Sequence, residues 1–276
     1  MKFFFPDSLD TVDPRYDFDA EQHSPYRVRH RTDVFAHEYL ETIPYDGILL
    51  SKALVDGYKG QRRYRDAQRL RLHREGSRRF FRLESTDLQT MGDCGAYAYI
   101  SEPAPPFELD EVLDFYAHGR FDYTFSVDHV IPGYRSPDRS PGRRIPKSWR
   151  ERYDLNLNLA DRYLALHRQY RLRATPIGTV QGWDPESYVD ATSALEKMGY
   201  TYLALGGLAS LQTEDIMPCV EAVQAAVRPS TRLHLLGVSR PRTMAQLHQW
   251  RIASFDSTMP LLQAFMDDKH NYHTAG

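Results

Sequence analysis

The sequence predicts an α/β fold, a closed (β/α)8 barrel of the TIM type with an N-terminal extension and inserted loops. Short β-rich runs alternate with helical stretches along the chain, a pattern typical of βαβ units with parallel strands. Roughly eight such units in a chain of 276 residues suit a closed barrel. A doubly wound open sheet is the second choice, but no GxGxxG motif follows an early strand to favour it.

The expected strands are short runs rich in aliphatic and aromatic residues. They are residues 47–53, 79–83, 95–100, 123–127, 176–180, 202–205, 233–237 and 252–255. The expected helices are residues 109–117, 155–170, 185–198, 216–227 and 243–250, with a helical turn at 70–75. The DPES sequence at the start of 185–198 is a helix-start signature. We expect one domain over 1–276, in which residues 1–46 form a layer packed on the barrel and MKFFFP favours a strand.

Composition narrows the function classes. The chain has two cysteines, Cys94 and Cys219, which excludes a disulfide framework and a cysteine-based zinc site such as CxCxxC. We name no metal ligands, a zinc site without cysteine stays open, and a reducing, cytoplasmic location is the default. No apolar run approaches the ~20 residues that a membrane helix needs, so no membrane span is expected.

Arginine is concentrated in two segments, 62–82 and 135–152, although the net charge is only −2. Arginine side chains suit phosphate oxygens, and solvated surface faces explain the clusters equally well. The segment 131–150 is rich in Pro, Gly, Ser and Arg, and recurrent proline favours an exposed loop. The candidate nucleic-acid-binding residues are Arg62, Arg63, Arg143, Arg144 and Arg150. Tyr134 and Trp149 are candidates for base stacking or for simple packing.

Polar residues and glycines follow the strands from the third expected strand region onward. In a (β/α) barrel, chemistry takes place at the carboxyl ends of the strands. The residues expected there are Asp93, Asp128, Gln181, Gly206, Gly207, Leu236, Gly237 and Asp256. A carboxylate can accept N–H bonds from a base edge, attack an acetal carbon, or move a proton. Asp256 alone would be explained as a turn or cap residue, but three aspartates at one barrel mouth suit base exchange at an N-glycosidic bond.

Six motifs in order resemble those of the tRNA-guanine transglycosylase superfamily. MGDCGAYAY is similar to its DSGGFQ-type strand, FSVDHVI to its FDE type, and TVQGW to VQGG. LALGGLA is similar to IGGLA, HLLGVSR to LMGVG, and ASFDST to the FDCV-type nucleophile strand. The spacings fit successive barrel strands.

The resemblance implies a role for each matching position. Asp256 resembles the nucleophile that forms a covalent glycosyl intermediate, and Asp93 resembles the general acid and base. The residues that resemble the base-binding set are Asp128, Gln181, Gly206, Gly207, Leu236 and Gly237. His129 stands where a glutamate is usual, which leaves the preferred 7-substituent open. The zinc site and C-terminal RNA-binding module of the tRNA enzymes are not expected here, and no cofactor is.

The two ends of the chain look most like the DNA-modifying branch (DpdA type), which implies a phage or bacterial enzyme. Its implied reaction replaces guanine in DNA by a free 7-deazaguanine base such as preQ0, with partner proteins of a modification cluster. Three alternatives stay open: a tRNA-guanine transglycosylase, a catalytically silent nucleic-acid-binding barrel, and an ordinary glycoside hydrolase. The last would normally include a glutamate in its acid pair and leaves the GGLA and VQG strands unexplained.

Overall fold

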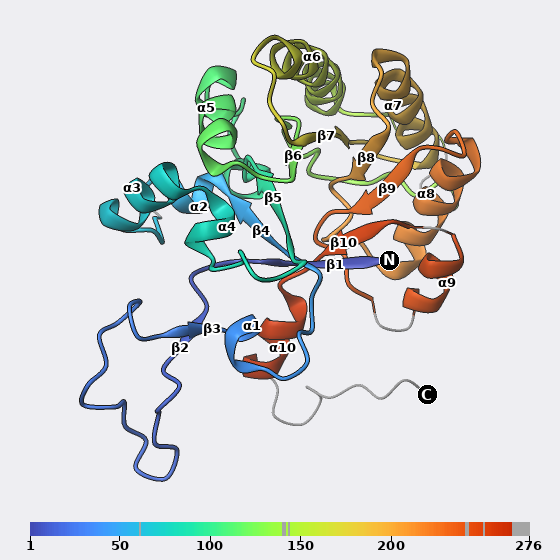
Figure 1. The fold of residues 1–276 in the computed structure, drawn as a ribbon. Coiled ribbons are helices and arrows are strands. Elements are labelled where there is room, and N and C mark those ends of the chain that lie inside the picture. The colour runs from blue at the N-terminus through green and yellow to red at the C-terminus, as the bar shows by residue number, and fades with distance from the viewer. Residues whose placement is uncertain (61, 140–141, 143, 241–242, 251, 267–276) are drawn as a thin grey trace.

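The chain folds as a closed barrel of eight parallel strands with helices on its outside (Figure 1). The computed structural model describes residues 1–60, 62–139, 142, 144–240, 243–250 and 252–266. The barrel strands are β1 (Lys2–Pro6), β4 (Gly47–Ser51), β5 (Gln89–Asp93), β6 (Tyr123–Phe125), β7 (Thr175–Val180), β8 (Tyr202–Leu205), β9 (Arg232–Leu235) and β10 (Ser254–Asp256). The sheet closes because β1 pairs with both β4 and β10. The predicted TIM-type fold is confirmed.

The helices connect consecutive barrel strands, and the longest of them form the outer ring seen in Figure 1. The longer helices are α3 (Asp66–Glu75), α5 (Leu109–Gly119), α6 (Lys147–Gln169), α7 (Pro185–Met198), α8 (Thr213–Ala226), α9 (Met244–Gln249) and α10 (Met259–Met266). The short ones are α1 (Ala36–Tyr39), α2 (Lys52–Asp56), α4 (Ser77–Phe80) and the 3-10 helix η1 (Ala96–Tyr99). Among the described residues, no helix is both long and apolar enough to cross a bilayer.

The barrel encloses a packed interior. Alternate strand residues point inward and outward, so the sheet separates two cores. The inner cluster consists of Phe4, Leu49, Met91, Phe125, Ile177, Tyr202 and Ala204. The larger outer core lies between the strands and the helices. The inner side chains therefore form a floor beneath the carboxyl ends of the strands.

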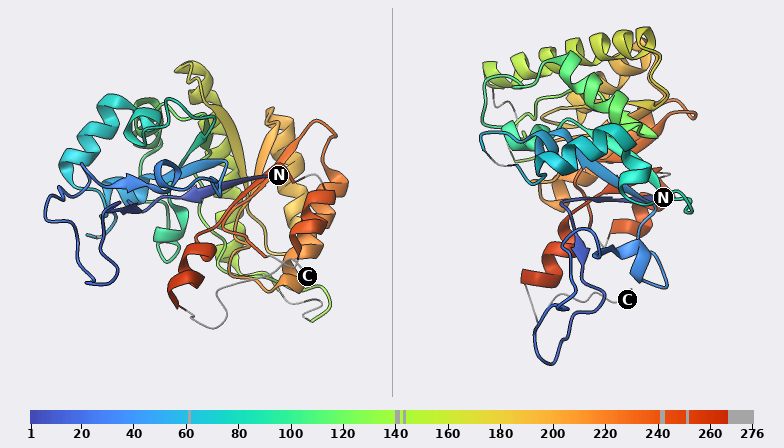
Figure 2. Two further views of the ribbon diagram at one scale, coloured as in Figure 1. Left: turned by 60° about the horizontal axis from the view of Figure 1, so that its bottom comes forward. Right: turned by 60° about the vertical axis from the view of Figure 1, so that its left-hand side comes forward.

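The N-terminal segment contributes to the barrel itself. Phe4 of β1 is opposite Asp256 of β10 and Gly47 of β4, so the expected layer over 1–46 is wrong for its first residues. The remainder holds a two-stranded antiparallel sheet of β2 (Thr11–Val12) and β3 (Val34–Phe35). The segment between these two strands extends away from the barrel (Figures 1 and 2).

Two expected strands are wrong. Residues 79–83 form the end of α4 and a turn with Arg82 in the left-handed region, at φ 56°. The aromatic residues that suggested a strand serve packing instead, since the Phe81 ring lies 5.5 Å from the ring of Phe35. Residues 95–100 form η1 and its end, and the third barrel strand is β5 instead. Its sequence, QTMGD, has little strand propensity and is held by pairing with β4 on one side and β6 on the other.

The Pro- and Arg-rich segment is a loop only in part. Residues 147–150 form the first turn of α6, because Pro146 is the last proline and precedes that helix. Arg135 pairs with Asp184, and Arg139 pairs with Asp215 at the start of α8. The Trp149 ring lies against the backbone of Gly133, where an added Cβ would come within 2.0 Å of it. Packing is therefore the structural role of Trp149.

Candidate active site

A cavity of about 600 Å³ lies at the carboxyl ends of the barrel strands. Parallel strands all end on one side of a barrel, so residues far apart in the sequence converge there. Every predicted catalytic and base-binding residue lines this cavity: Asp93, Asp128, Gln181, Gly206, Gly207, Leu236, Gly237 and Asp256. The volume lies within the range of about 300–1,000 Å³ that is typical of small-molecule sites.

Asp256 is the last residue of β10, and only one of its two carboxylate oxygens is hydrogen-bonded by the described residues. His234 Nε2 and the Gly237 amide nitrogen each lie 3.0 Å from Asp256 Oδ1. The turn after β9 directs this amide toward the carboxylate, because Gly237 adopts the left-handed backbone, with φ 69°, that glycine accommodates without strain. Asp256 Oδ2 accepts no hydrogen bond from the described residues. One carboxylate oxygen is thus fixed by the protein and the other is available to a ligand.

Asp128 and Gln181 form the opposite part of the lining. Gln181 Nε2 donates to Asp128 Oδ2 at 2.7 Å, and the Cys94 thiol lies 3.5 Å from Asp128 Oδ1. Gly206 makes room for this arrangement, since a Cβ at that position would lie 2.4 Å from Gln181 Nε2. Burial raises the pKa of Asp128 to about 6. The pair presents amide and carboxylate oxygens to the cavity, which suits a base edge that carries N–H groups.

Asp93 ends β5 and accepts a hydrogen bond of 2.8 Å from the Gly95 amide. Burial, followed by the negative charge of Asp128, raises the pKa of Asp93 to about 7, and Asp256 adds a smaller contribution. A carboxyl group with a pKa near neutrality can both give and take a proton at physiological pH. Asp93 and Asp128 thus both have a raised pKa, and burial is the first cause in each case.

The raised pKa of Asp128 predicts a pH-dependent stability. The folded state binds the Asp128 proton more tightly than the unfolded state does. The free energy of unfolding is therefore highest below pH ~4, where both states hold the proton, and it decreases as the pH rises through about 6, where the folded state loses it. The shift of about two pKa units corresponds to at most ~3 kcal/mol. We expect Asp128→Asn to melt several degrees above the wild type at pH 8 and to lose this advantage at pH 4.5. Calorimetry across this range measures the difference, and a constant offset would contradict the assigned pKa.

Comparison with known proteins adds to this geometry. No family model matches the chain. The chain is 42% identical over 275 residues to a DNA-guanine transglycosylase of Salmonella montevideo. The chain is thus similar to a guanine transglycosylase over nearly all of its own length. The match covers 99% of this chain and 65% of that relative, so the aspartate-lined cavity lies within the shared region. The family resemblance predicted from the six motifs is confirmed.

The arginines predicted to bind nucleic acid differ in their surroundings. Arg62 pairs with Asp66 at 2.6 Å, so its charge is locally balanced. Arg63 is exposed, and Arg143 lies outside the described residues. Arg144 and Arg150 line a surface hollow of about 310 Å³ together with Lys147, on the segment that follows β6 and opens α6. This segment begins at the same barrel end as the aspartates.

Neither His118 nor His129 lines the aspartate-lined cavity. His118 lies on α5 one turn before the amino end of β6, and thus toward the opposite end of the barrel. His129 is fully buried, and its Nε2 atom lies 3.4 Å from the Tyr99 carbonyl oxygen rather than in the cavity lining. His129 therefore does not contact a ligand in this cavity in place of the glutamate that is usual at this position.

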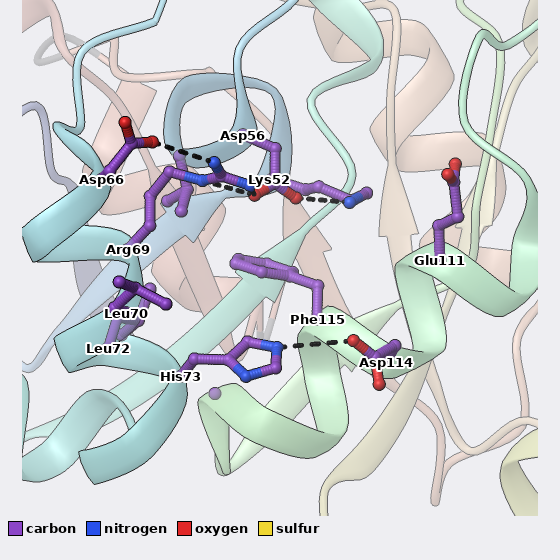
Figure 3. Close-up of a pocket in the computed structure, with 12 residues that line it drawn as sticks. Lys52, Asp56, Asp66, Arg69, Leu70, Leu72, His73, Glu111, Asp114 and Phe115 are labelled. Atoms are coloured by element: carbon purple, nitrogen blue, oxygen red, sulfur yellow. Dashed lines mark hydrogen bonds and ion pairs between the residues drawn. The ribbon is translucent and has the colours of Figure 1, made fainter.

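A second cavity, of about 400 Å³, lies outside the barrel beside α2, α3 and α5 (Figure 3). Ion pairs join Arg69 to Asp56 across it, and His73 faces Asp114 at 3.4 Å (Figure 3). The ligand atoms of His73, Asp114 and His118 lie within 4.8 Å of one another. The His118 Nδ1 atom lies 2.9 Å from the Asp114 carbonyl oxygen, and the centroids of the two imidazole rings lie 3.4 Å apart in a stacked arrangement.

The cysteines do not fit the zinc site known in the tRNA enzymes. Cys94 is buried beside Asp128 and Tyr99, whereas Cys219 is buried on α8 beside Tyr134. Within the described ranges they belong to different surroundings, and neither can contribute to a common cysteine-based centre.

Two residues that lie at or beside the aspartate-lined cavity were not identified from the sequence. His234 donates to Asp256, and Arg240 brings a positive charge to the lining. The signal for His234 was present, because it lies two residues before Leu236 on the same face of an otherwise apolar strand. Arg240 follows the strand and carries no periodic signal. Its guanidinium is held by the carbonyl oxygens of Ala209 and Leu211.

Proposed function

We propose that this protein is a DNA-guanine transglycosylase that exchanges guanine in DNA for a 7-deazaguanine base through a covalent aspartyl intermediate. The observation that carries the proposal is the meeting of Asp93, Asp128 and Asp256 in one cavity at the carboxyl ends of the strands. The related Salmonella protein, named as a DNA-guanine transglycosylase, supports the same reaction and favours DNA over tRNA.

The proposed reaction has two half-reactions. In the first, Asp256 Oδ2 attacks the sugar C1′ and forms an ester bond while the bond from C1′ to guanine breaks. Asp93 in its acid form gives the departing guanine a proton. In the second, Asp93 as the carboxylate takes a proton from the incoming base, whose nitrogen attacks C1′ and releases Asp256. One glycosidic bond replaces another, so the exchange needs neither ATP nor a redox cofactor.

Asp128 and Gln181 are the proposed readers of the base edge. Asp128 accepts N–H bonds from the ring, and Gln181 fixes its orientation from the side at 2.7 Å. The neighbouring backbone at Gly206 and Gly207 allows a flat base to lie close to the chain. The target nucleotide must leave the DNA stack to reach this cavity, so we expect it to be flipped out or already unpaired.

The proposal is tested by the incorporation of radiolabelled guanine into double-stranded DNA and unmodified tRNA offered in parallel, with Asp256→Asn as the control. Label in DNA that depends on Asp256 supports the proposal, and competition by preQ0 then tests the 7-deazaguanine preference. Label in tRNA alone would replace DNA by tRNA as the polynucleotide. If the protein binds either polynucleotide but gives neither exchange nor a covalent adduct, the result would favour a catalytically silent nucleic-acid-binding barrel.

Arg144 and Arg150 are the proposed phosphate contacts. Replacing both by Gln is expected to lower DNA affinity and to reduce the slope of log affinity against log salt by roughly 1–2. The matched control is Arg171→Gln with Arg173→Gln, which removes the same charge just before β7, at the opposite end of the barrel. Titrations by fluorescence anisotropy from 50 to 300 mM salt, ~ten points each, give both slopes. Equal slopes for the two double variants would remove the loop from the DNA-binding surface.

A further inference from the structure

His234 lies behind Asp256 in the barrel interior. Its side chain on β9 is fully buried, and its ring lies 5.3 Å from the ring of Phe125 and 6.4 Å from that of Phe4, measured between centroids. His234 Nε2 lies 3.0 Å from Asp256 Oδ1, and Nδ1 lies 2.6 Å from Ser254 Oγ. Both ring nitrogens are thus bound, and the ring has no direct path to a ligand.

The hydrogen-bond partners fix the tautomer of His234. An ionised Asp256 only accepts, so Nε2 carries the proton of this bond. On the other side, Ser254 Oγ is also bonded to the Tyr202 hydroxyl. If Tyr202 donates to Ser254 and Ser254 donates to Nδ1, each hydroxyl hydrogen has an acceptor. In an imidazolium, Nδ1 would donate to Ser254 and Ser254 would donate to Tyr202, which would leave the Tyr202 hydrogen without an acceptor among these groups. The neutral Nε2–H tautomer therefore satisfies the network best.

We propose that His234 is a positioning residue that decides which oxygen of Asp256 reacts. This inference rests on the proposed function and deepens it. His234 and the Gly237 amide both hold Oδ1, which leaves Oδ2 to form the bond to C1′. The chain from Tyr202 through Ser254 keeps the imidazole in the orientation that this requires.

The same hydrogen bond has a second consequence for the reaction. In the covalent intermediate, Asp256 is an ester and Oδ1 is its carbonyl oxygen. When the incoming base attacks C1′, the bond between C1′ and Oδ2 breaks and Asp256 leaves as a carboxylate. A hydrogen bond to a carboxylate is stronger than one to a neutral carbonyl group. His234 therefore stabilises the departure of Asp256 more than it stabilises the ester, and this favours the second half-reaction.

The test compares His234→Leu, which loses the donor, with His234→Gln, whose Nε2 amide can replace it. His167→Leu is the matched control, because His167 is also buried and its Nε2 atom donates to the Ala174 carbonyl oxygen at 2.9 Å, but it lies on α6 outside the barrel. Each variant is assayed for guanine exchange into an oligonucleotide, and for the fraction of enzyme trapped as a covalent protein–DNA adduct in denaturant.

For His234→Leu we expect kcat to fall by ~10²-fold with little change in the KM for DNA, and the adduct fraction at steady state to rise. His234→Gln is expected to recover most of the rate. Ser254→Ala, which removes only the link to Tyr202, is expected to lose less and to provide the answer if His234→Leu does not fold. A merely structural role would lower the active fraction and leave the ratio of adduct to active enzyme unchanged.

The outcomes separate this inference from the function on which it rests. If the wild type exchanges guanine and both His234→Leu and Ser254→Ala behave like His167→Leu, the role of His234 is overturned and the proposed function stands. If the wild type forms neither product nor adduct with DNA or tRNA, the proposed function fails and this inference fails with it.

Discussion

Asp256→Asn is expected to lower the rate of guanine exchange by at least ~10⁴-fold. An amide cannot form the ester to C1′, and no other carboxylate occupies its place between His234 and the Gly237 amide. DNA affinity should persist, because the proposed phosphate contacts lie elsewhere. Exchange rates and anisotropy titrations on the same preparation measure the two effects.

The control for this variant is Asp46→Asn. Asp46 precedes β4 at the opposite end of the barrel, where its carboxylate accepts a hydrogen bond of 2.8 Å from the Phe3 amide. The same chemical change there should leave exchange intact. If Asp256→Asn retained a covalent adduct with DNA, the nucleophile would have to be reassigned.

Asp93→Asn is expected to slow exchange by ~10²–10⁴-fold and to remove its pH dependence near neutrality. The pKa of Asp93 is raised to about 7, mainly by burial and then by the charge of Asp128. The first half-reaction uses the acid, so kcat/KM for DNA should fall as the pH rises above about 7. The second uses the carboxylate, so kcat/KM for the incoming base should fall as the pH drops below about 7.

Profiles of both kcat/KM values from pH 5 to pH 9, spanning about two units either side of the expected pKa, check this assignment. The opposite slopes are the distinguishing feature, because loss of folded protein at extreme pH would lower both values together. A wild-type enzyme with two flat profiles, or an Asp93→Asn variant that keeps either slope, would mean that another group moves the proton.

The sequence predicted the barrel and its mouth better than its individual strands. Glycine and aspartate after short apolar runs indicated the strand ends, and all eight residues chosen there line one cavity. The sequence did not predict strand β5, because QTMGD has few residues that favour strands. The aromatic residues at 79–83 and 95–100 favour strands, but these segments form helices and turns. Pairing with neighbouring strands, which a single sequence does not display, decides between them.

Side-chain pairing was the other missing information. The motifs identified Asp256, but its bond to His234 depends on the register in which Ser254 lies opposite His234. Likewise, composition could not separate Arg62, which pairs with Asp66, from Arg144 and Arg150. Charge clusters in a sequence give no account of the partners that neutralise them.

The packed interior of the barrel has a consequence for the order of events. Phe4, Phe125 and Tyr202 are among the side chains that fill the space below the aspartates. The cavity is therefore closed at the bottom, and a ligand enters and leaves it at the carboxyl ends of the strands. In a base-exchange enzyme built this way, outgoing guanine must vacate the site before its successor enters. The DNA strand, held through the sugar on Asp256 in the interval, then stays in place while one base replaces another.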